Sequence, residues 1–140
     1  MKIAYIVHMK GCVDMQTVAL SSNAQDDSVI LSSAVAKIAD LWGFTNEKLG
    51  AILGLSSATI SRMRSGKSML EPRTKSFEAG QVLLRLFRSL DALVGSDDLA
   101  ARAWLSAPNI DLASRPLDLI ERFQGLLLVC DYVDDYRARV

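Results

Sequence analysis

The sequence has little of what enzymatic chemistry requires. It contains one histidine, His8, in a stretch without a recognisable pattern, so we find no histidine-based dyad and no two-histidine metal site. The phosphate-binding GxxxxGK(S/T), the GxSxG nucleophile elbow and the GxGxxG dinucleotide fingerprint are also missing. Asp134 and Asp135 are adjacent, so on a helix they would point about 100° apart and make a poor acid–base pair. We therefore expect a protein that is not an enzyme, with no catalytic residue, no metal and no cofactor.

Cysteines and long apolar runs are scarce as well. Cys12 and Cys130 form no CxxC motif, and nothing else points to secretion, so we expect two free thiols. No apolar run approaches the roughly eighteen residues that cross a bilayer. The apolar stretch within residues 1–9 is too short for a secretory signal. These absences predict a cytoplasmic protein that does not enter a membrane.

The turn-forming residues indicate the fold class. Three prolines and eight glycines are few for a β-sandwich, while half of the residues are hydrophobic and can fill a core. A helical pattern begins at residue 28, with Ser28 or Asp27 as the candidate N-cap and Gly43 as the stop. Its apolar positions are Leu31, Val35, Ile38 and Trp42. The sequence predicts an all-α protein.

The longest predicted helix covers residues 74–94, and its apolar arc is wider than a one-sided surface helix requires. Such a helix is expected where two subdomains or two protomers meet, so we predict a homodimer through it. Before the first helix, residues 1–9 could make a strand, and residues 21–27 read as a polar loop or a disordered lead-in. Shorter helices are expected over residues 45–53, 56–65 and 97–105, from Pro116 up to an interruption at Gly125, and over residues 126–136.

Residues 45–66 carry the strongest motif, TNEKLGAILGLSSATISRMRSG. Gly50 is small where a second helix would cross the first, and Gly54 can take the left-handed conformation that a tight turn requires. Four apolar side chains would hold the two short helices together at a steep angle: Leu49, Leu53, Leu55 and Ile60. The segment is typical of a helix-turn-helix, whose second helix enters the major groove of DNA.

The candidate DNA contacts lie on the outer side of that second helix and just after it. Short hydroxyls at a helix N-terminus can reach phosphates or base edges, and arginine can bind guanine with two hydrogen bonds. The candidates are Ser57, Ala58, Thr59, Ser61, Arg62, Arg64 and Lys67. Residues 45–75 hold six basic and two acidic side chains, whereas residues 97–140 hold five basic and eight acidic ones. This separation suggests two partners, although ordinary solvated charge would look the same.

The motif resembles the Xre/phage-repressor helix-turn-helix family over its whole length. A second block, AWLSAPNIDLASRPLDLI at residues 103–120, resembles the toxin-binding domain of Xre/MbcA/ParS antitoxins. The hallmark of that domain is Trp-Leu-x-x-Pro-Asn followed by Arg-Pro-Leu-Asp-Leu-Leu. The chain departs from it at Ala113-Ser114, where the family has a glycine-rich step. The two resemblances together cover roughly residues 28–140, in the order typical of the family.

The resemblance implies three segments. Residues 1–27 are an extension of uncertain structure, residues 28–75 form a DNA-binding domain, and residues 76–140 hold the long helix and a toxin-binding domain. It further implies a type II antitoxin that binds operator DNA and represses its own operon. Its protein partner would be a cognate RES-domain toxin that degrades NAD⁺, with the antitoxin covering the toxin's active site. The alternative is a plain transcriptional regulator whose C-terminal domain dimerises or senses a ligand.

The candidate toxin contacts lie in the C-terminal block, where rings and charges alternate. Tyrosine and arginine are enriched at binding hot spots, and a tail with rings, charges and a free carboxylate could occupy a dinucleotide pocket. The candidates are Arg115, Asp118, Tyr132, Asp134, Asp135, Tyr136, Arg137, Arg139 and Val140. Three alternatives stay open: Arg115 could pair with Asp118, Trp104 could be a core residue, and the tail could be a solvated helix end.

Overall fold

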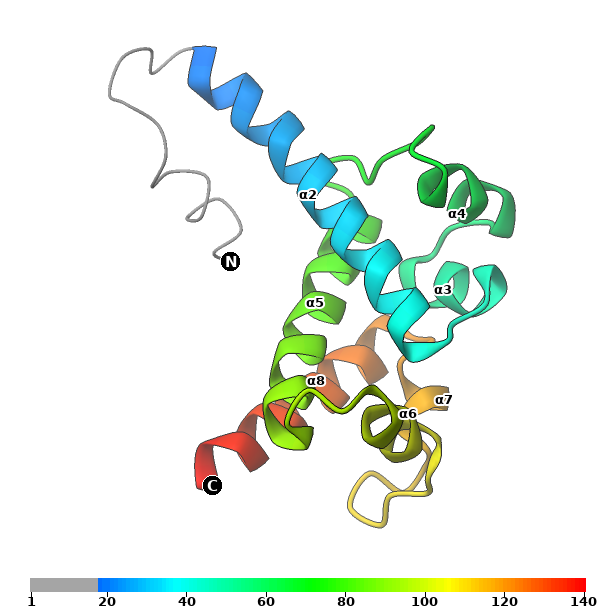
Figure 1. The fold of residues 1–140 in the computed structure, drawn as a ribbon, viewed down its shortest axis with the longest axis vertical. Coiled ribbons are helices and arrows are strands. Elements are labelled where there is room, and N and C mark those ends of the chain that lie inside the picture. The colour runs from blue at the N-terminus through cyan, green and yellow to red at the C-terminus, as the bar shows by residue number, and fades with distance from the viewer. Residues whose placement is uncertain (1–17) are drawn as a thin grey trace.

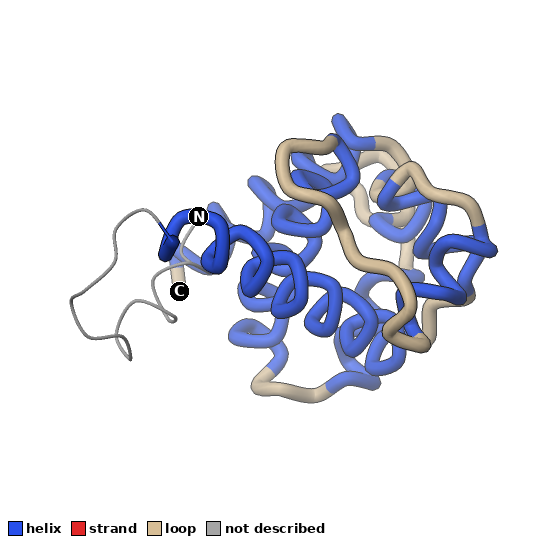
Figure 2. Tube along the Cα trace, turned by 90° about the horizontal axis from the view of Figure 1, so that it is seen from above, coloured by secondary structure: helices blue, strands red, loops and turns tan. Residues whose placement is uncertain are grey.

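The computed structural model describes residues 18–140, with side chains from residue 23 onward. This part of the chain folds into helices without a strand, apart from one isolated bridge between Asn109 and Ser114 (Figures 1 and 2). The all-α prediction is confirmed, while the strand predicted within residues 1–9 lies outside the described residues. The helices are α2 (Val18–Trp42), α3 (Asn46–Leu53), α4 (Ser57–Arg64), α5 (Lys75–Val94), α6 (Asp98–Ser106), α7 (Pro116–Leu119) and α8 (Phe123–Arg139).

Helix α2 begins ten residues earlier than predicted, so the loop predicted over residues 21–27 is wrong. Ser28 is not an N-cap, because its hydroxyl donates to the Ala24 carbonyl 3.0 Å away, one turn back in the same helix. Polar residues cost at most about 0.7 kcal/mol each in a helix, so a helix anchored in the core extends through them. Figure 1 shows this first part of α2 projecting from the body of the molecule.

Helix α5 runs through the centre and contacts α2, α3, α6 and α8 (Figure 1). It crosses α2 closely at Gly80, where an added Cβ would lie 2.9 Å from the Leu70 side chain and 3.4 Å from that of Leu31. Its wide apolar arc is therefore filled largely by helices of the same chain. The width of this arc, from which we predicted a homodimer through α5, is thus explained within one chain.

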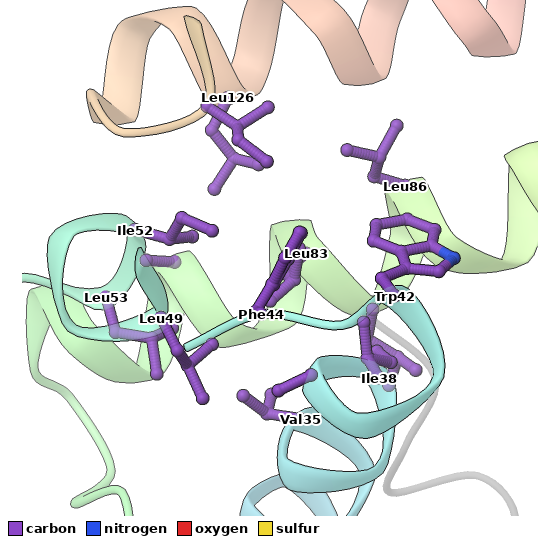
Figure 3. Packing of buried hydrophobic residues seen from close by; sticks show 14 of the residues in the cluster. Val35, Ile38, Trp42, Phe44, Leu49, Ile52, Leu53, Leu83, Leu86 and Leu126 are labelled. Atoms are coloured by element: carbon purple, nitrogen blue, oxygen red, sulfur yellow. The ribbon is translucent and has the colours of Figure 1, made fainter. Parts of the chain in front are cut away.

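The core draws on α2, α3, α5 and α8 together (Figure 3). Leu31, Leu49, Leu83 and Leu126 come from these four helices, and each is fully buried. Burying a leucine side chain fully is worth about 1.5–3 kcal/mol. The helix-turn-helix and the C-terminal segment thus share one core, which fixes their relative position.

Four of the described helices, α3, α4, α5 and α6, begin directly after a residue whose side chain caps the helix. The hydroxyls of Thr45, Ser56 and Thr74 accept from the amides of Lys48, Thr59 and Phe77, each at 3.1 Å. Each hydroxyl satisfies one of the backbone donors that a helix start leaves free. Helix α6 is capped by Asp97, whose carboxylate accepts from the Ala100 amide.

Gly125 does not interrupt the last helix, in contrast to the prediction. Helix α8 begins at Phe123, so Gly125 lies in its first turn. A Cβ at this position would collide with the Leu119 carbonyl oxygen at the end of α7. The glycine therefore permits close approach of two backbones, a role that helical periodicity cannot reveal.

Candidate DNA and toxin interfaces

Helices α3 and α4 form the helix-turn-helix. Gly54 caps α3 with φ 71° and ψ 34°, the left-handed conformation predicted for the turn. The Leu55 amide donates to the Gly50 carbonyl at 2.8 Å and closes the turn. An added Cβ at Gly50 would lie 2.5 Å from the Leu55 carbonyl oxygen. Gly50 is thus needed for the turn backbone rather than for the crossing of the second helix.

The outer side of α4 presents a small set of polar groups to solvent. Ser57, Ala58, Ser61 and Arg62 are all exposed. The Arg62 guanidinium donates to the Thr59 hydroxyl at 3.1 Å, which holds its side chain along the helix surface. This face offers hydroxyls, a methyl group and a guanidinium, the groups that read base edges in the major groove. The five residues lie together as the sequence predicted.

Arg64 and Lys67 differ from the rest of the predicted DNA-contact set. The Arg64 guanidinium donates to the Phe44 carbonyl at 2.9 Å and lies 3.8 Å from the Asp40 carboxylate. Arg64 therefore braces α4 against the end of α2, and a DNA contact would compete with this bond. Lys67 is exposed just beyond α4, where an ammonium can approach a phosphate.

Arg115 and Asp118 pair with each other at the start of α7. The guanidinium makes two hydrogen bonds to the carboxylate, both 2.8 Å long. These bonds lower the pKa of Asp118 and raise that of Arg115 from their ordinary values. Both side chains remain about half exposed. Arg115 thus pairs with Asp118, which is the structural alternative to a toxin contact that the sequence left open.

Two of the predicted toxin contacts in α8 are engaged within the chain. The Asp134 carboxylate accepts hydrogen bonds from the Arg85 guanidinium, at 2.7 Å, and from the Ser89 hydroxyl, both on α5. The bond to Asp134 raises the pKa of Arg85. The Tyr132 hydroxyl donates to Asp111 at 2.9 Å. Asp134 and Tyr132 therefore hold α8 in place, whatever else they contact.

The remaining tail candidates are exposed at the end of the molecule. Helix α8 continues to Arg139, so the tail is a helix end rather than a loose extension (Figure 1). The exposed candidates are Asp135, Tyr136, Arg137, Arg139 and Val140. The structure thus separates the C-terminal candidates into an exposed group and the engaged residues Tyr132 and Asp134.

An apolar groove lies between the ends of α5, α6 and α8, which the sequence had not indicated. Its volume is about 320 Å³. Trp104 stacks on Tyr132 with ring centroids 6.4 Å apart, and Tyr132 lies 6.3 Å from Tyr136. The spacing of the two tyrosines, four residues apart on one helix, was the available signal. The lining residues are Leu90, Leu93, Val94, Trp104, Tyr132, Val133 and Tyr136.

A second pocket, also about 320 Å³, lies between α3 and α6 and contains two cations that the sequence had not singled out. The Arg102 guanidinium donates to the Leu41 carbonyl at 2.7 Å and to the Asp40 carbonyl at 3.3 Å. It therefore neutralises the carbonyl end of α2. The Lys48 ammonium bonds to Glu121 at 2.6 Å. Both cations join the helix-turn-helix side to the C-terminal side.

Other reactive groups in the described residues are few. Cys130 is a free, fully buried thiol, as predicted, and burial raises its pKa to about 11; Cys12 lies outside the described residues. Among residues 18–140, no group of three or more His, Cys, Asp or Glu side chains could hold a metal ion. None of the helices in this range has the length and apolar character that crossing a bilayer requires.

Comparison with known families assigns both parts of this structure. The model of the antitoxin Xre-like helix-turn-helix domain matches residues 23–88, from α2 through most of α5. The model of the antitoxin Xre/MbcA/ParS C-terminal toxin-binding domain matches residues 89–139. No curated protein matches the chain. The chain therefore combines the two domains of the Xre-type antitoxins, an Xre-like helix-turn-helix followed by an Xre/MbcA/ParS toxin-binding domain.

Proposed function

We propose that this protein is the antitoxin of a type II module, that it blocks a cognate RES-domain toxin, and that it represses its own operon. The observation that supports this most is the single core shared by two matched domains. A helix-turn-helix with an exposed recognition face is joined rigidly to a toxin-binding domain. One chain can thus hold DNA and toxin at once.

The DNA-binding part of the proposal rests on α4. Its exposed face carries Ser57, Ser61 and Arg62, with Lys67 close behind for a phosphate. We expect α4 to enter the major groove of the promoter, with Arg62 contacting a base edge.

Repressors of this kind bind paired half-sites as dimers, so the proposal includes a homodimer on DNA. Because the apolar arc of α5 is largely covered by its own chain, we expect another surface to supply the contact. Val29 and Ile30 on the projecting helix α2 are 44% and 41% exposed and are candidates. Light scattering of the protein, alone and on operator DNA, tests for a dimer mass.

The toxin-binding part of the proposal assigns neutralisation to the exposed end of α8. The full chain should protect cells that co-express a RES-domain toxin, scored by growth and by cellular NAD⁺. Deleting residues 135–140 should abolish protection, because the exposed ring of Tyr136 and the charges of Asp135, Arg137 and Arg139 are lost. The deletion begins after Asp134, since that carboxylate ties α8 to α5 through Arg85.

Arg62→Ala is the matched control, because it should protect cells as well as the full chain. If the shortened chain protects equally at equal abundance, the inhibitory element lies elsewhere, and the segment of residues 115–120 is the next candidate. A full chain that binds its promoter but neither protects nor co-purifies with the toxin would support the plain regulator instead.

A further inference from the structure

We propose that the aromatic groove between α5, α6 and α8 anchors the toxin by receiving one of its apolar side chains. The inference rests on the proposed antitoxin function and adds the place and chemistry of the contact. The expected occupant is an aromatic or branched aliphatic residue on the toxin surface, since the groove has an apolar floor and walls of aromatic rings. The charged end of α8 would then contact the toxin around this anchor.

The groove is built in advance of any partner. Its floor includes Leu90 and Val133, each 1% exposed, so it is part of the core. Tyr132 is fixed on two sides, by its hydrogen bond to Asp111 and by stacking on Trp104. Rings held in this way lose little conformational entropy when a partner binds, which favours affinity.

The size and chemistry of the groove fit a side chain of a protein partner. At about 320 Å³ it lies at the small end of the range for ligand pockets. Tyr136, at its outer edge, is 54% exposed and can close over a side chain that enters. Tryptophan and tyrosine are the residue types that dominate binding hot spots.

The position of the groove favours the toxin over a second copy of this chain. All of its lining residues lie between Leu90 and Tyr136, within the matched toxin-binding domain, and none lies in the matched DNA-binding domain. A charged side chain lies beside the groove, since the exposed Asp111 accepts the hydrogen bond of the lining residue Tyr132. An apolar centre with a charged rim is the usual anatomy of a protein–protein interface.

Tyr136→Ala tests the anchor without disturbing the core. Titration of purified RES-domain toxin, made inactive by substitution, should show about ten- to hundredfold weaker binding than the unsubstituted chain. Tyr136→Phe keeps the ring and should bind nearly normally. Leu128→Ala is the matched control, because Leu128 is a similarly exposed apolar residue of α8, at 50%, that does not line the groove. Promoter affinity and the unfolding midpoint should be unchanged in all three variants.

Three results would overturn the inference. Toxin binding by Tyr136→Ala that equals binding by Leu128→Ala would exclude the groove as the anchor. A dimer mass in light scattering that Tyr136→Ala abolishes, with toxin binding intact, would assign the groove to a second copy. If the unsubstituted chain binds no RES-domain toxin, the proposed function fails and the anchor fails with it. This result differs from the first two, in which the unsubstituted chain still binds the toxin.

Discussion

The Lys48 ammonium on α3 lies 2.6 Å from the Glu121 carboxylate, 73 residues further along the chain. The same ammonium reaches the Leu117 carbonyl at 3.4 Å. Lys48 belongs to the first helix of the helix-turn-helix, and both acceptors belong to the toxin-binding domain. The ion pair thus crosses the boundary between the two domains.

The Lys48–Glu121 pair should show a small but measurable coupling. We expect a double-mutant cycle of Lys48→Ala and Glu121→Ala to give about 0.2–1 kcal/mol, because both side chains are partly exposed to solvent. Urea unfolding of the four proteins provides the free energies. The shared core also predicts one transition, so separate unfolding of the two domains would contradict this account of their interface.

Arg62→Ala should weaken promoter binding by about 1–3 kcal/mol, the value of a bidentate contact to a base. The measurement is a gel-shift titration at fixed salt. Arg88→Ala is the matched control, because Arg88 is an exposed arginine on α5, outside the helix-turn-helix. Unchanged affinity would show that Arg62 makes no base contact.

Arg64→Ala should instead lower the free energy of unfolding by about 1 kcal/mol, since it breaks the bond to the Phe44 carbonyl.

Gly125→Ala should destabilise the protein by about 1–3 kcal/mol, the usual cost of forcing a group into a packed site. The added methyl would meet the Leu119 carbonyl, so α7 and α8 must separate. Gln124→Ala, at an exposed neighbouring position of the same helix, should have little effect. Denaturant midpoints measure both. Equal midpoints would show that α7 and α8 can separate at Gly125 without loss of stability.

The buried thiol of Cys130 should make stability fall at high pH. Burial raises the pKa of Cys130 from 9.0 to about 11, so the native state holds this proton more tightly than the unfolded state does. This contribution is fully present below about pH 9 and is lost as the pH rises toward 11. Cys130→Ala lacks it and should show a smaller decline between pH 9 and 11 in urea midpoints. Parallel declines would contradict the raised pKa.

The helix-turn-helix could be predicted because its determinants are local in the chain. The caps Thr45 and Ser56 bond to amides three residues away, and Gly54 determines the turn by its own backbone angles. The apolar positions repeat with the period of a helix. The exposed face of α4, with Arg62 on it, follows from the same periodicity.

Tertiary structure alone determined the other features. Arg85 and Asp134 are 49 residues apart, and Lys48 and Glu121 are 73 apart, so no local pattern relates them. The early start of α2 depends on the anchoring of the same helix in the core further along, and the role of Gly125 depends on the Leu119 carbonyl that lies against it. Sequence determined most of the helical segments and which of their faces are apolar, because backbone hydrogen bonding and side-chain periodicity act over a few residues. Packing decided which apolar faces are covered by the chain itself and which remain open to a partner, because that depends on helices brought together from distant parts of the sequence.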